Sequence, residues 1–201
     1  MKFLVFDMDG VLVDTTSCHA RAFDDLWRRY GIEGPEYAAI AGRPTREVVA
    51  PYTRDIAEWT EFKQQRAREY MRAEPVVFDD AAPCIRALHR AGFGMGVATG
   101  ASRATAEMLL ERAEIAGFFR FLLAAEDVIH GKPHPEVYRK AAERAEAKTI
   151  VVEDSAAGLQ AAVAAASEVA CVRSGLTCDS PLFLGSYPGL LGFTESLGVQ
   201  V

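Results

Sequence analysis

Short apolar runs alternate with helical patterns along most of this chain, and this alternation limits the fold more than any other feature. Each run is about five residues long and rich in branched or aromatic side chains, which is typical of a buried strand. The runs cover residues 2–6, 95–98, 121–125, 149–152 and 169–172. Helical patterns cover residues 81–91, 102–115, 135–147 and 155–166. Ser102 and Ser155 are the expected N-caps, and Pro135 fits a first helical turn. The sequence therefore predicts an α/β fold, a parallel sheet with helices on both faces.

The stretch from residue 15 to residue 78 departs from this alternation, because it contains helical patterns and no strand-like run. Aromatic and aliphatic side chains recur on one face of two of these patterns, within residues 23–30 and 56–71. We expect these stripes to form a core of their own rather than a ligand site. The predicted organisation is an α/β core of residues 1–14 and 79–201, with an α-helical cap of residues 15–78 inserted after the first strand.

Charge and composition exclude several classes of protein. Of 201 residues, half are apolar and a quarter are charged, which is typical of a folded domain and not of a disordered chain. The net charge of −6, without a basic block, argues against a nucleic-acid partner. Asp7 and Asp9 interrupt the first apolar run too early for a signal peptide. The longest uncharged stretch, residues 180–194, contains several Pro and Gly and is too short to span a membrane.

The four cysteines show neither a CxxC pair nor a zinc-ligand spacing. Reduced thiols that fill apolar space are the simplest interpretation. Reduced thiols favour a cytoplasmic protein. We expect no membrane partner, and a monomer by default.

Acidic residues follow two of the predicted strands. Asp7 and Asp9 come after the first strand, and Glu153 and Asp154 come after the fourth. Parallel strands end at the same edge of a sheet, so these carboxylates would repel one another unless they bound a cation. Oxygen ligands without His or Cys suit Mg²⁺. Asp is also common in turns and helix caps, an alternative that accounts for one such residue better than for two acidic pairs.

Two further segments offer groups that bind phosphate. Lys132 lies in residues 131–135 (GKPHP), directly before a predicted helix, where the prolines would fix the point at which its ammonium emerges. Thr99 and Gly100 supply a hydroxyl and an unobstructed backbone N–H ahead of another helix. Taken alone, Lys132 is more simply a solvated surface lysine. Beside the carboxylates, these groups predict a metal-assisted site for a phosphorylated ligand.

Four segments together resemble the motifs of the haloacid dehalogenase superfamily, in the phosphatase and phosphomutase branch with a helical cap after the first strand. They are residues 7–15 (DMDGVLVDT), 99–102 (TGAS), 131–135 (GKPHP) and 152–158 (VEDSAAG). The resemblance covers residues 3 to about 175 and implies a Rossmann-like core with an inserted cap. The dehalogenases of the superfamily lack the second aspartate, here Asp9, so the resemblance favours phosphoryl transfer over carbon–halogen cleavage.

The resemblance implies roles for the residues that would act on a phosphate ester. Asp7 would be the nucleophile that forms an aspartyl-phosphate, and Asp9 would be the general acid and base. Thr99, Gly100 and Lys132 would hold the transferred phosphoryl group.

The resemblance also implies Mg²⁺ as the cofactor. Asp7 and Asp154 would ligate it, with Asp9 and Glu153 as further carboxylates at the metal. A carboxylate is a weak nucleophile, and the charge of a metal on the phosphoryl oxygens would allow its attack.

The predicted cap carries weaker signals. Thr15 and His19 stand where β-phosphoglucomutase-like members of the family carry a hinge threonine and a histidine. Residues 42–46 (GRPTR) resemble the cap loop of those members, whose arginine, here Arg46, grips the distal phosphate of the substrate. A guanidinium can bind phosphate through two hydrogen bonds. A solvent-facing Arg46 and a His19 buried in the hinge remain the alternatives.

Two features depart from the family pattern. The helix over residues 155–166 runs into residues 165–167 (AAS), where relatives have an Ala-Gly turn that supplies a left-handed cap residue. After Val172 the chain is rich in Gly and Pro and resembles the family only loosely, so no function is assigned to this tail.

A zinc site is not predicted. His130 and His134 have the four-residue spacing of a two-histidine site on a helix, but Pro133 and Pro135 prevent one continuous helix there.

The sequence thus predicts a Mg²⁺-dependent phosphatase that acts on a small phosphorylated metabolite, such as a sugar phosphate or a phosphoglycolate-like ester. A β-phosphoglucomutase-like phosphomutase is the first alternative, because related caps serve both activities. A non-catalytic ligand-binding protein is the second. The sequence does not name the substrate, because the pocket-lining residues of the cap depend on tertiary packing.

Overall fold

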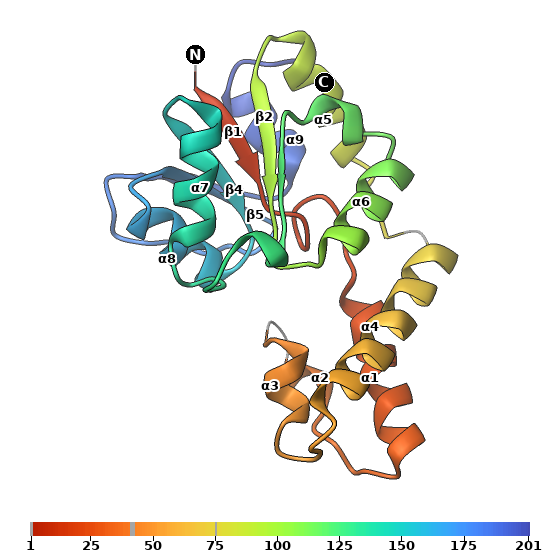
Figure 1. Ribbon diagram of the computed structural model, residues 1–201. Coiled ribbons are helices and arrows are strands. Elements are labelled where there is room, and N and C mark those ends of the chain that lie inside the picture. Colours follow the sequence, from red (N-terminus) through yellow and green to blue (C-terminus); the bar gives the residue numbers. More distant parts are fainter. Residues whose placement is uncertain (1, 41–42, 75) are drawn as a thin grey trace. The chain divides into compact units, whose positions relative to one another are not determined.

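The computed structural model describes residues 2–40, 43–74 and 76–201 (Figure 1). The chain forms two compact units, one of Met1–Asp14 with Val77–Val201 and the other of Thr15–Val76. The sequence placed the end of the second unit at residue 78. Within the described ranges, no helix combines the length and the apolar composition that a membrane span requires.

The first unit, which we call the sheet unit, is built on a parallel sheet. Its strands are β1 (Phe3–Phe6), β2 (Gly94–Ala98), β3 (Leu122–Leu123), β4 (Thr149–Glu153), β5 (Glu168–Val172) and β6 (Phe183–Tyr187). Neighbouring strands pair in the order β3-β2-β1-β4-β5-β6, each pair parallel. β1 lies inside the sheet, where Phe3 pairs with Gly94 of β2 and with Thr149 of β4. The predicted α/β class and the five predicted strands are confirmed.

Helices cover both faces of this sheet, as predicted. They are α5 (Ala81–Arg90), α6 (Arg103–Arg112), α7 (Glu136–Ala145), α8 (Ala156–Ala164) and α9 (Leu190–Ser196), with short 3₁₀ turns η1 (Ala116–Phe118) and η2 (Ala125–Asp127). In Figure 1, α7 and α8 lie on one side of the sheet, and α5, α6 and α9 lie on the other. Both predicted N-caps are confirmed: the Ser102 Oγ accepts the N–H of Thr105, and the Ser155 Oγ accepts the N–H of Gly158.

The third strand is shorter than predicted. The sequence assigned residues 121–125 to it, but the strand holds only Leu122 and Leu123. The Asp127 carboxylate accepts the N–H of Ala124 at 2.7 Å, which turns the backbone into η2 instead of extending the strand.

The turn after α8 has an alanine at the position where relatives carry a left-handed glycine. Ala166 takes the left-handed conformation, with φ 57°, and Ser167 donates its N–H to the Ala162 carbonyl at 3.1 Å. An L residue in this conformation costs roughly 1–2 kcal/mol, so the alanine tolerates strain that glycine would avoid.

The tail after Val172 forms structure that the sequence did not predict. It adds β6 at the edge of the sheet and then α9, whose Leu190 and Phe193 are buried. β6 lacks the uniform apolar run of the inner strands, because its residues alternate between partly buried and exposed positions.

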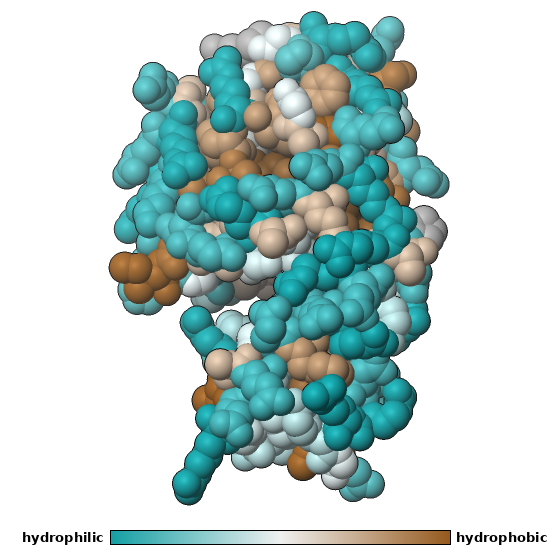
Figure 2. Space-filling view, turned by 45° about the vertical axis from the view of Figure 1, so that its right-hand side comes forward, coloured by the Kyte–Doolittle hydropathy of each residue, from teal (hydrophilic) through white to brown (hydrophobic). Residues whose placement is uncertain are grey.

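The second unit, which we call the helical unit, contains α1 (Thr16–Tyr30), α2 (Tyr37–Ile40), α3 (Thr45–Val49) and α4 (Ile56–Ala73). Its buried cluster consists of Phe23, Leu26, Trp27, Ile40, Val48, Val49 and Trp59. The Tyr30 ring of α1 stacks on the Trp59 ring of α4, with 4.1 Å between ring centroids. The aromatic stripes therefore form the core of this unit, as predicted, and hydrophilic side chains cover most of its face in Figure 2.

Candidate active site

The carboxyl ends of three strands bring the predicted motifs of the sheet unit together. Asp7 directly follows β1, Thr99 follows β2, and Glu153 is the last residue of β4. Asp7 donates its N–H to the Val152 carbonyl at 2.9 Å, which continues the β1–β4 ladder one step past the strand. The ladder therefore places the Asp7 and Glu153 backbones at the same level of the sheet edge.

Lys132 is the cation at this edge. Its Nζ lies 2.5 Å from the Asp7 Oδ1 and 2.6 Å from the Glu153 Oε1, and it donates to the Ala98 carbonyl at 3.2 Å. The Lys132 side chain is 14% exposed, and that of Glu153 is fully buried. Lys132 is therefore an interior cation held between two carboxylates, and the simpler interpretation as a solvated surface lysine is wrong.

Glu153 is held by hydrogen bonds at both oxygens. Its Oε1 accepts from Lys132 and from the Tyr138 hydroxyl, and its Oε2 accepts from Ser155 Oγ at 3.0 Å. Space for this carboxylate depends on Gly158, where a Cβ would come within 1.9 Å of the Glu153 Oε1. These contacts favour a role in fixing Lys132.

Tyr138 is a site residue that the sequence reasoning missed. It is fully buried on α7, and its hydroxyl donates to Glu153. Burial, reinforced by the nearby Glu153 charge, raises the pKa of Tyr138 well above its ordinary value, so the hydroxyl stays protonated as a donor. The available signal was a tyrosine on the apolar face of a helix that begins just after Lys132.

Asp154 lies against the turn that follows β1. Gly10 has φ 75°, and a Cβ at that position would come within 1.9 Å of the Asp154 Oδ2. The turn is closed by a hydrogen bond from the Gly10 N–H to the Val13 carbonyl at 2.7 Å. Only glycine allows the backbone to turn this way and the carboxylate to approach it.

Three carboxylates converge at this edge, and the Lys132 ammonium contacts two of them. Oxygen atoms of Asp7, Glu153 and Asp154 lie within 4.8 Å of one another. Burial raises the pKa of Asp7 well above its ordinary value, and Lys132 opposes that rise only in part. Burial, with the Glu153 charge, also raises the pKa of Asp154 to about 6. A hard divalent cation would hold both groups ionised, so the donor set fits Mg²⁺.

Asp9, Thr99 and Gly100 surround this centre without joining the carboxylate group. Asp9 is half-buried, and its charge contributes to the raised pKa of Asp7. The Thr99 side chain is buried, and its Oγ1 accepts the N–H of Ala101 at 3.1 Å. Gly100 is exposed, with open space where a Cβ would lie.

The other predicted residues belong to the helical unit. Thr15 is buried just before α1, and Arg46 is exposed on α3, while Gly42 of the same predicted loop lies outside the described residues.

His19 of α1 contacts a lysine that the sequence did not predict. The His19 Nδ1 lies 2.7 Å from Lys63 Nζ. Burial and the Lys63 charge lower the pKa of His19 to about 3, so its neutral ring accepts from the ammonium.

This chain is similar to known hydrolases and phosphatases. A family model described as haloacid dehalogenase-like hydrolase matches residues 1–166. The chain is 31% identical over 181 residues to fructose-1-phosphate phosphatase YqaB of Escherichia coli, which covers 85% of this chain and 95% of the relative. It is 30% identical over 190 residues to validoxylamine A 7'-phosphate phosphatase of Streptomyces hygroscopicus subsp. limoneus, covering 89% and 88%. The crystal structure of CbbY from Rhodobacter sphaeroides in complex with phosphate superposes with a TM-score of 0.78 at 25% identity, covering 93% of each chain.

Proposed function

Because this chain belongs to the haloacid dehalogenase-like hydrolase family, we propose that it is a Mg²⁺-dependent phosphatase that hydrolyses a small phosphomonoester. The observation that carries the proposal is the buried Lys132 ammonium beside Asp7, with Asp154 within reach of the same point. A carboxylate nucleophile, a fixed cation and a second carboxylate for a metal are the groups that phosphoryl transfer through an enzyme carboxylate requires.

The proposed reaction has two steps. A carboxylate oxygen of Asp7 attacks phosphorus, the bond from phosphorus to the ester oxygen breaks, and Asp9 gives its proton to the leaving oxygen. Asp9 then takes a proton from a water molecule, whose oxygen attacks phosphorus. The bond to Asp7 breaks, which releases phosphate and restores both side chains.

Lys132, Thr99 and Gly100 bind the transferred group in this proposal. Lys132 supplies a positive charge beside the nucleophile, and Glu153 holds that charge in position. The exposed Gly100 offers a backbone N–H that no Cβ shields, next to the buried Thr99 hydroxyl.

Asp7 and Asp154 are the proposed ligands of Mg²⁺, with Asp9 close by. When bound, Mg²⁺ reduces the repulsion between the Asp7 carboxylate and the phosphoryl oxygens. Glu153 is assigned to Lys132 rather than to the metal, because its side chain is fully buried and its Oε1 pairs with the Lys132 ammonium at 2.6 Å.

The helical unit is the proposed cap, and substrate selection is its proposed role. Arg46 would bind a distal anionic group, which its exposure on α3 permits. Thr15 and His19 lie at the start of this unit, where the chain leaves the sheet unit. One relative is named as a fructose-1-phosphate phosphatase, which supports a sugar phosphate as the substrate class.

A panel of sugar phosphates, phosphoglycolate and nucleotide monophosphates, assayed with Mg²⁺ for released phosphate, tests this function. We expect release from at least one sugar phosphate, and loss of that release when EDTA replaces Mg²⁺. Conversion of glucose 1-phosphate to glucose 6-phosphate with negligible release would instead establish a phosphomutase and overturn the proposal.

Lowering the pH is expected to weaken Mg²⁺ binding. Without a cation, Asp154 holds its proton below its pKa of about 6. Metal ligation needs the carboxylate, so binding at lower pH displaces that proton. The apparent dissociation constant should therefore rise as the pH falls, by at least about tenfold per pH unit below this pKa. Titration calorimetry in buffers of different ionisation enthalpy measures both the constant and the released proton, and an affinity that is independent of pH would contradict this prediction.

Replacing Gly10 with alanine is expected to slow phosphate release by about 100-fold, because the new Cβ would collide with Asp154 and displace it. Gly175→Ala is the matched control. Gly175 also has a positive φ, 65°, but a Cβ there meets nothing within 4 Å. The control therefore imposes the same kind of backbone strain without touching the site. Equal rates for the two variants would show that the contact between Gly10 and Asp154 is unimportant.

A further inference from the structure

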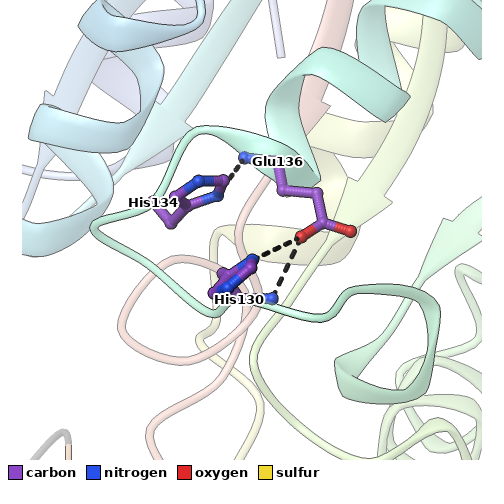
Figure 3. A group of neighbouring side chains, drawn as sticks. All are labelled: His130, His134 and Glu136. Atoms are coloured by element: carbon purple, nitrogen blue, oxygen red, sulfur yellow. Dashed lines mark hydrogen bonds and ion pairs between the residues drawn. The ribbon is translucent and has the colours of Figure 1, made fainter.

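A second group of side chains with metal-ligating atoms lies on and next to the loop that carries Lys132. His130, His134 and Glu136 converge where this loop enters α7 (Figure 3). One nitrogen of each histidine and one oxygen of Glu136 lie within 4.8 Å of one another. The two imidazole rings are 4.6 Å apart between centroids. None of the three residues belongs to the carboxylate centre at the sheet edge.

The sequence argument against a zinc site rested on the absence of a helix, and that premise is correct. Residues 131–135 are not helical, and α7 begins only at Glu136. The loop brings the rings together in another way, because it folds back on Glu136. The Glu136 carboxylate accepts the N–H of Ile129 at 3.1 Å and of His130 at 3.0 Å. Helical spacing is therefore not needed for these side chains to meet.

Glu136 is an anchored anion. Its Oε1 accepts from Lys140 Nζ at 2.8 Å. That bond, together with the backbone donors of His130 and Ile129, lowers the pKa of Glu136 to about 2. The carboxylate is therefore ionised at neutral pH and already held at the position where the histidines converge.

The histidines are arranged so that a metal could use their nitrogens. The His130 Nδ1 lies 3.4 Å from the Glu136 Oε2, close to the separation of two ligand atoms on one tetrahedral zinc ion. The His134 Nδ1 accepts the N–H of Glu136 in a long hydrogen bond of 3.3 Å, a weak contact that a metal could replace. Both rings are exposed, so an ion can reach them from solvent.

We propose that His130, His134 and Glu136 form a binding site for a divalent transition metal ion, Zn²⁺ in the first place. Two imidazoles and one carboxylate are the donors of a three-ligand zinc site whose remaining position is open to water. Nitrogen donors also separate this site from the all-oxygen carboxylate centre, which suits Mg²⁺. A bound ion would join His130 and His134 on either side of Lys132, and so restrain the segment that carries the catalytic cation.

The proposal is tested by measuring the Zn²⁺ affinity of the whole chain in competition with a chromophoric chelator. An Asp154→Asn background removes a ligand of the carboxylate centre, so that centre contributes little. In this background, we expect Zn²⁺ affinity to fall by at least about tenfold in each of three variants, His130→Ala, His134→Ala and Glu136→Gln. Mutating a residue that only hydrogen-bonds to a metal ligand already costs about tenfold in affinity, so losing a ligand should cost at least as much. His89→Ala, which removes a histidine of α5, should leave the affinity unchanged.

The unaltered chain offers an independent readout, because it contains four histidines. On addition of Zn²⁺, the imidazole NMR signals of His130 and His134 should shift, while those of His19 and His89 should not. Zn²⁺ affinity unaffected by the His130 and His134 variants, or shifts absent from those two rings, would overturn the proposal. The assays contain no phosphate ester, so their outcome is independent of the proposed phosphatase activity.

Discussion

Replacing Lys132 with methionine is expected to lower the free energy of unfolding by about 3–5 kcal/mol, the usual cost of removing one partner from a buried ion pair. The ammonium lies within 2.6 Å of both the Asp7 and Glu153 carboxylates. Methionine fills a similar volume but leaves these carboxylates without a cation. They would have to take up protons or admit water, and both responses destabilise the fold.

Urea denaturation of the metal-free protein measures this effect. Lys2→Met is the control, because Lys2 and Glu168 form a salt bridge whose side chains are 47% and 30% exposed, and its loss should cost at most about 1 kcal/mol. Adding Glu153→Gln to Lys132→Met should restore part of the stability, since the amide carries no charge and can still accept from Tyr138. A Lys132→Met chain as stable as Lys2→Met would show that the ammonium does not compensate the buried carboxylates.

Replacing Asp7 with asparagine is expected to lower phosphate release by at least about 10³-fold, because the amide cannot serve as the nucleophile. The fold should persist. Asparagine has the shape of aspartate, and Glu153 still pairs with the Lys132 ammonium at 2.6 Å in this variant. A loss of activity without loss of structure would therefore identify a chemical role for this carboxylate.

Acid-quenched protein provides a second measurement of the same prediction. After incubation with substrate labelled at phosphorus, the unaltered chain should retain covalent label, and Asp7→Asn should retain none. Asp14→Asn is the control, because Asp14 is an exposed carboxylate on the same segment. Release unchanged in Asp7→Asn would refute the assigned nucleophile, and release absent from the unaltered chain on every substrate would favour a non-catalytic binding protein.

The sheet and the convergence of its motifs were predictable because they depend on local pattern and on one general rule. Apolar runs that stop at acidic residues identify strand ends, and parallel strands bring those ends to one edge. That reasoning placed Asp7 and Glu153 near each other without knowledge of the loops. The position of Lys132 between them agrees with the resemblance in residues 131–135.

The unpredicted features depend on tertiary contacts instead. Tyr138 has the pattern of an ordinary core residue, and only the packing of α7 against β4 directs its hydroxyl to Glu153. The pairing of Lys63 with His19 needs α1 beside α4, since the two residues are 44 positions apart. His130 and His134 meet because Glu136 binds backbone N–H groups of the preceding loop, a contact that spacing rules do not describe.

The two edges of the sheet have a consequence for how this chain behaves at high concentration. β3 at one edge is only two residues long. β6 at the other edge joins β5 through an irregular register, and Gly185 within it has φ 141°. Short or irregular edge strands present few aligned N–H and C=O groups to a second chain, which is how many β-containing proteins avoid aggregation. The unpredicted tail thus ends the sheet in a form that discourages further strands from adding to it.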